Sequence, residues 1–175
     1  ALPSLRSPYH EARNPPLWEL GHIGWFQEWS LGRFSQRHLG LAADPDAPRR
    51  APARADADRL YNSSRVPHDA RWDLPLPDAQ ATRDDLARQL ESTLALLGRV
   101  EGSDDDSLYF YRLALLHEDM HHEAALYMAQ SLGIAIDDAR WQAAALPAPP
   151  PPLQLTAGRW QLGCDAARGF AFDNE

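Results

Sequence analysis

Three long stretches of the chain carry the apolar spacing of helices and end at capping residues or glycine. They cover about 15–39, 78–100 and 107–132. We therefore expect a mainly α fold, an up-down helical bundle with a short β-type segment at its C-terminal end. Because a bundle normally closes its core with four helices, we also expect a fourth helix upstream of the first residue.

The segments between and after these stretches differ in composition. We expect 47–58 (APRRAPARADAD) to be solvated and mobile, and 60–77, with its aromatic and aliphatic residues, to be packed. The proline-rich stretch 143–152 predicts a semi-rigid linker. The short alternating pattern after it predicts β-structure. The expected organisation is a helical domain over 1–142, a linker, and the truncated start of a second domain over 153–175.

Composition excludes several classes of protein. The net charge of -8 argues against a nucleic-acid partner, because phosphate binding needs a basic surface. No apolar run is long enough to span a membrane, and the polar N-terminus is not a secretory signal. A single cysteine, Cys164, forms no internal disulfide and suits a reducing compartment. We therefore expect a cytoplasmic protein.

Two histidines lie on one face of the stretch 107–132. Residues four apart on a helix have Cβ atoms roughly 5–6 Å apart, so the imidazoles of His117 and His121 can reach one ion. The apolar stripe that contains them comprises Leu113, His117, Met120, His121, Ala124 and Met128.

A third histidine, His22, lies within an aromatic stripe with Trp18, Trp25 and Trp29. A buried imidazole needs a partner, because an unsatisfied buried polar group costs about 1–3 kcal/mol. A metal ion shared with the other two histidines would satisfy it. Three imidazoles suit zinc, copper, iron or nickel, and ligand type alone does not choose among them. Three protein ligands also leave positions open, as in catalytic sites.

Each of these residues also has a purely structural interpretation. The histidines can be core residues bonded to backbone carbonyls, and the aromatic stripe around Trp25 can be plain core. Glu123 can support a metal ligand by a hydrogen bond or be a surface carboxylate. Arg65 and Arg71 can bind a carboxylate substrate or pair with nearby acidic residues.

Several motifs together resemble one enzyme family. The segments NPPLWELGHIGWFQE (14–28), HEDMHHEA (117–124) and GFAFDNE (169–175) are similar to those of the ergothioneine-type sulfoxide synthases. Those non-heme iron enzymes join a DinB-like helical bundle to a formylglycine-generating-enzyme-like domain. The loop YNSSRVPHDARWDLPLP (61–77) resembles the selenoneine synthase branch most.

The resemblance implies a bacterial oxidoreductase that binds Fe(II) through His22, His117 and His121, with Glu123 supporting them; zinc or nickel can replace iron in a crystal. The implied reaction uses O2 to form a C–S or C–Se bond on hercynine, with a thiol or selenium donor. Met120 stands where several relatives have a glutamine that contacts the substrate, which implies a different donor, such as a selenosugar. The family's catalytic tyrosine lies in the downstream domain, so we expect this chain to hold the metal half of the site.

Two other functions share the same residues. A stand-alone DinB-like, metal-dependent thiol transferase would use the same three histidines. The sequence that follows Glu175 would distinguish this hypothesis from that of a sulfoxide or selenoneine synthase. A non-catalytic helical domain would use the histidines only to fill a core.

Overall fold

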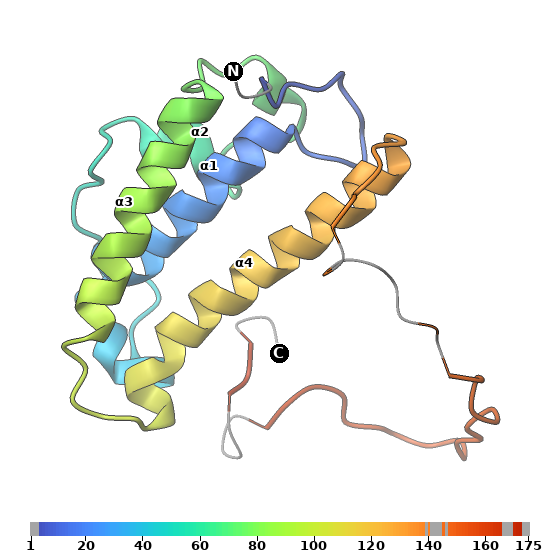
Figure 1. Cartoon of the computed structure of the whole chain (residues 1–175). Coiled ribbons are helices and arrows are strands. Elements are labelled where there is room, and N and C mark those ends of the chain that lie inside the picture. Colours follow the sequence, from blue (N-terminus) through green and yellow to red (C-terminus); the bar gives the residue numbers. More distant parts are fainter. Residues whose placement is uncertain (1–3, 139, 141–144, 146, 166–169, 173–175) are drawn as a thin grey trace. The chain divides into compact units, whose positions relative to one another are not determined.

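The computed structural model describes residues 4–138, 140, 145, 147–165 and 170–172, and its fold is mainly helical, as the sequence predicts (Figure 1). The elements are α1 (Pro16–Gln27), the π-helical turn η1 (Glu28–Gly32), the 3₁₀ helix η2 (Arg37–Ala42), α2 (Ala57–Tyr61), the 3₁₀ helix η3 (Asp69–Trp72), α3 (Ala79–Leu97) and α4 (Asp105–Ser131). The chain divides into two compact units, Ala1–Ala125 and Leu126–Glu175. This division falls within α4, ahead of the predicted domain boundary at 142.

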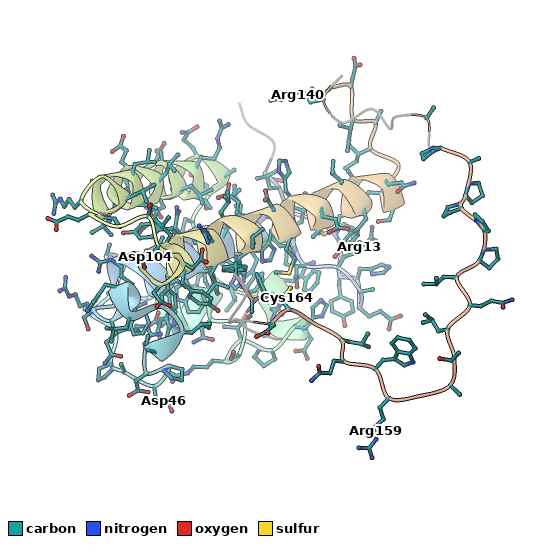
Figure 2. All side chains as sticks on the ribbon, turned by 90° about the horizontal axis from the view of Figure 1, so that it is seen from below. Arg13, Asp46, Asp104, Arg140, Arg159 and Cys164 are labelled. Carbon is teal, nitrogen blue, oxygen red and sulfur yellow. The ribbon has the colours of Figure 1, made fainter. Side chains whose placement is uncertain are left out.

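The ends of α3 and α4 follow the capping signals of the sequence. The Asp78 carboxylate accepts a hydrogen bond from the amide of Ala81 at 2.8 Å and caps α3. Asp104, labelled at the start of α4 in Figure 2, accepts from both the amide and the hydroxyl of Ser107. At the other end of α4, Gly133 has a φ of 68°, the left-handed conformation that closes many helices.

The prediction of one continuous helix over 15–39 is wrong for the second half of that range. Regular α-helix ends at Gln27, and a hydrogen bond from the Arg33 amide to the Glu28 carbonyl widens the next turn to π geometry. Beyond it, Phe34 is buried and packs edge-to-face against Phe110 of α4. Tertiary packing at this point outweighs the local helical pattern.

The segment 47–58 is partly exposed, as the prediction of a solvated stretch requires, but several contacts also tie it to the helical unit. Arg33 donates from Nε to the Arg50 carbonyl at 2.6 Å, and the Arg50 amide donates back to the Arg33 carbonyl. The guanidinium of Arg49 lies 3.5 Å above the centre of the Phe34 ring. Asp58, at the end of the segment, accepts two hydrogen bonds from Arg33. Arg33, from outside the segment, and Arg49, from within it, thus hold the two ends of this stretch.

The core lies between α1, α2 and the segment that follows them. Its buried residues are Trp18, Trp25, Ala57, Leu60 and Tyr61, with Phe26, Trp29, Leu74 and Leu76 packed against them. This confirms that 60–77 is packed.

Helix α3 lies beside α1 (Figure 1) and buries less than its leucine pattern predicts. Leu86 faces α1 near Gly24, but Leu90, Leu94 and Leu97 are exposed. The buried side chains of α3 are those of Ala79 and Thr82, at its beginning. No described element covers the leucines of its second half.

The predicted β-type segment is not seen. Residues 153–165 and 170–172 contain no strand, and 166–169 and 173–175 lie outside the described residues. An alternating pattern forms a strand only beside a pairing partner, and the described residues supply none. Residues 143, 144 and 146 of the predicted linker also lie outside the description. Among the described helices, none is long and apolar enough to cross a bilayer.

Replacing Gly21 by alanine is expected to destabilise the protein by about 1–3 kcal/mol, the usual effect of overpacking a core. A Cβ atom there would lie 2.3 Å from Cε1 of the buried Tyr61 ring. Urea unfolding measures the loss. Gly32→Ala is the control, because its Cβ would meet only Glu28 Cγ at 3.7 Å. Equal stability of the two variants would contradict this packing.

Asp58→Asn is expected to lower the free energy of unfolding at pH 7 by about 1–2 kcal/mol, because it leaves the buried Arg33 charge without its anion. Hydrogen bonds from Arg33 hold the pKa of Asp58 below its ordinary value. The difference in unfolding free energy between wild type and Asp58→Asn is therefore complete above the pKa of an unfolded aspartate, about 3.9. It is lost as the pH falls through the lower pKa of Asp58 in the folded protein. Urea unfolding across this pH range measures it.

Asp46→Asn, on the surface directly before this segment, is the control and should change stability by no more than about 0.5 kcal/mol. A difference between wild type and Asp58→Asn that stays constant down to pH 2 would contradict the ion pair.

Candidate metal centre

Three histidines from two helices meet inside the first unit. His22 comes from α1, and His117 and His121 come from α4. One ring nitrogen of each lies within 4.8 Å of those of the others. The ring centroids are 4.6 Å apart for the α4 pair, and 5.2 and 5.0 Å from His22 to His117 and His121. The structure thus brings together the three residues that the sequence analysis singled out.

His22 is held by a stack and a hydrogen bond. Its ring lies parallel to that of Trp18, with centroids 4.8 Å apart. Its Nδ1 is 2.8 Å from the carbonyl oxygen of Tyr61, the last residue of α2. A carbonyl only accepts, so Nδ1 must carry the proton and Nε2 keeps its lone pair. The ring therefore offers Nε2 as its ligand atom.

His117 is positioned by Phe26, whose ring stacks on it at a centroid distance of 3.7 Å and an angle of 9°. Burial, together with the neighbouring His121 and His22, lowers the pKa of His117 to about 3. Burial likewise lowers the pKa of His22 to about 4, against the opposing effect of its bond to Tyr61. Both rings are neutral at physiological pH, which is the form that binds metals.

His121 faces the carboxylate of Glu19, with its Nδ1 3.3 Å from Oε2. Its other nitrogen, Nε2, is buried and has no hydrogen-bond partner. A buried polar atom of this kind is costly unless something binds it. A metal ion among the three rings would supply that partner.

Glu19 is the functional residue that the sequence analysis missed. It is buried, and its Oε1 accepts a hydrogen bond from the Asn14 amide nitrogen at 2.8 Å. Burial alone would raise the pKa of Glu19, but the hydrogen bonds to His121 and Asn14 outweigh it and the pKa lies below its ordinary value. The available signal was its position three residues before His22, on a neighbouring part of the same helix face.

Other candidate residues lie in different surroundings. Trp25 is buried, lies beside His22 and donates its indole N–H to Asp58. Arg71 donates to the Asn14 side chain and the Val66 carbonyl, not to an acidic residue.

The remaining three candidates are exposed. Met120 is 48% exposed although the helical pattern placed it on the inward stripe, because it lies at the edge of that stripe. Glu123 and Arg65 are also exposed. The carboxylate that reaches a histidine is Glu19, and Glu123 has the position of a surface residue.

A cavity of about 630 Å³ between α1, α3 and residues 50–57 is separate from the histidines. Three of the arginines in its wall pair with acidic residues: Arg33 with Asp58, Arg54 with Asp56, and Arg88 with Asp85. Glu28, also in its wall, accepts from the Ala53 amide. The candidate chemistry-bearing groups of the first unit therefore lie in the histidine cluster and not in this cavity.

The donor set fits a transition metal. Neutral imidazole is a good ligand for zinc, copper, iron and nickel, and two of the three rings already turn a bare Nε2 away from their Nδ1 partners. Three ligands leave room for further molecules at the ion.

Neither the family models nor the curated proteins that were compared with the chain match it.

Proposed function

We propose that this chain is the metal-binding part of an O2-dependent non-heme iron enzyme that forms a C–S or C–Se bond on hercynine. The observation that carries the metal site is the convergence of three imidazoles around the buried, unpartnered Nε2 of His121. Iron, hercynine and the sulfur or selenium donor come from the family resemblance of the motifs around these histidines.

His22, His117 and His121 would hold the ion, which when bound supplies the one-electron and O2 chemistry that amino-acid side chains lack. The residues around them have the properties that such a site needs. The parallel rings of Trp18 and Phe26 cover one face each of His22 and His117, which excludes water and fixes the rings. Glu19 places one negative charge next to the cluster, which offsets part of the charge of a bound cation.

The exposed position of Met120 agrees with a role at the opening of the site. It lies one residue before His121 on α4, and its side chain is half exposed. A thioether is a soft, polarizable group with weak hydrogen-bonding capacity. Such a group suits a sulfur- or selenium-containing donor better than an imidazole that needs a strong hydrogen bond.

Anaerobic titration with Fe(II) is expected to load one ion per chain, and His117→Ala is expected to abolish this loading. The variant loses one of only three protein ligands. Elemental analysis after desalting, together with competition against a chelator, measures it. His122→Ala is the matched control, because His122 neighbours His121 but is exposed. Unchanged iron content in His117→Ala, or equal loss in both variants, would refute the site.

The reaction itself is tested with the product of the complete reading frame that encodes this chain. Loaded with Fe(II), it is mixed with hercynine, O2 and either a cysteine-containing thiol or a selenosugar. We expect O2 consumption and a hercynine product that carries a new C–S or C–Se bond, identified by mass spectrometry. An iron-loaded protein that forms neither product with any donor would contradict the proposed function and leave the metal site standing.

A further inference from the structure

A continuous chain of hydrogen bonds leads from the loop 62–77 to the histidine cluster. Arg71 donates to the side-chain oxygen of Asn14 at 2.6 Å, and the Asn14 nitrogen donates to Glu19 Oε1 at 2.8 Å. Glu19 Oε2 then faces His121 Nδ1 at 3.3 Å. Asn14 accepts from Arg71 and donates to Glu19, while His121 donates to Glu19 from the other side, so the two donors converge on a carboxylate that can only accept.

The N-terminal segment is held where this chain needs it. Pro15 takes the N-cap position of α1, and no side chain caps this helix end. The amide of Asn14 is therefore available to join Arg71 to Glu19. Contacts between the N-terminal segment and the loop fix its place, since Trp72 donates to the Ser7 carbonyl at 3.0 Å.

Arg71 also reaches a second histidine by another path. Its guanidinium carbon lies 3.9 Å from the centre of the Trp18 ring, and Trp18 stacks in turn on His22. One arginine thus supports His121 through hydrogen bonds and His22 through stacked rings. The two supported histidines lie 99 positions apart on different helices, α1 and α4.

We infer that Glu19, held by Asn14 and Arg71, is a positioning residue that fixes the tautomer and orientation of His121 for metal binding. A carboxylate accepts only, so it keeps the proton of His121 on Nδ1 and leaves Nε2 free to bind a metal. This inference rests on the metal site of the proposed function and adds to it residues that do not touch the ion.

The isosteric variant Glu19→Gln is informative because Glu19 uses both of its oxygens as acceptors. Glutamine has a single oxygen, so its amide nitrogen must face either Asn14 or His121. When it faces His121, it favours the tautomer in which Nδ1 accepts and Nε2 carries the proton, and a protonated Nε2 binds no metal. The variant keeps the shape and size of the side chain but can no longer accept hydrogen bonds from both Asn14 and His121.

The test measures metal affinity and the tautomer of His121 in the same set of variants. Glu19→Ala and Glu19→Gln are expected to weaken Fe(II) binding by about 10–100-fold, the usual effect of removing such a partner, and Arg71→Ala to weaken it less. Long-range ¹H–¹⁵N NMR of the metal-free protein is expected to show the Nδ1–H tautomer of His121 in the wild type and a shift toward Nε2–H in the Glu19 variants.

Two exposed residues provide matched controls. Glu123→Gln removes a carboxylate from α4, and Arg65→Ala removes an arginine from the same loop as Arg71. Both should bind Fe(II) like the wild type. Circular dichroism and thermal unfolding identify any variant that fails to fold. If the Glu19 variants fail, the milder Asn14→Ala takes their place in the measurements of Fe(II) affinity and of the His121 tautomer.

The outcomes separate this inference from the proposed function. If the wild type binds no iron, the metal site itself fails. If the wild type binds iron and folded Glu19 variants bind it equally well with an unchanged His121 tautomer, the positioning role is wrong and the site stands. A loss of affinity in Glu123→Gln equal to that in Glu19→Gln would also overturn it, because a general charge effect would then explain both.

Discussion

The hydrogen bonds at Nδ1 of His22 and His121 determine what the histidine cluster can do. Each has an acceptor as its partner, the Tyr61 carbonyl for one and the Glu19 carboxylate for the other. An imidazole with its proton fixed on Nδ1 turns a bare Nε2 to the opposite side. Without these partners, three neighbouring imidazoles would be free to exchange hydrogen bonds with one another. With them, two of the three rings keep a bare Nε2, which is the arrangement that the proposed metal site requires.

Much of the fold was predictable because local signals and tertiary packing agree there. Asp78 and Asp104 cap the starts of α3 and α4, and Gly133 follows the end of α4, as their residue types predict. The histidine pair on α4 was predictable from spacing alone, since residues four apart share a helix face whatever packs against it. The third histidine, His22 on α1, was predictable because a histidine among tryptophans needs a polar partner.

The failures arise where long-range contacts override local pattern. The regular α-helix that starts at Pro16 ends at Gln27, and beyond it Arg33 pairs with Asp58, a partner 25 positions away. Glu19 was missed for the same reason, since the residue it meets on α4 is 102 positions away. No local pattern reveals either partner, because each pair joins residues that are distant in the sequence.

The account is tested most directly by anomalous scattering from crystals grown with Fe(II) under anaerobic conditions. It predicts one peak at the iron edge within about 2.0–2.2 Å of Nε2 of His22, His117 and His121, the usual range for bonds between a metal and imidazole. It also predicts that Nδ1 of His121 still faces Glu19 in the loaded protein. An iron peak on other residues, or an empty cluster with three histidines bonded only to protein groups, would contradict it.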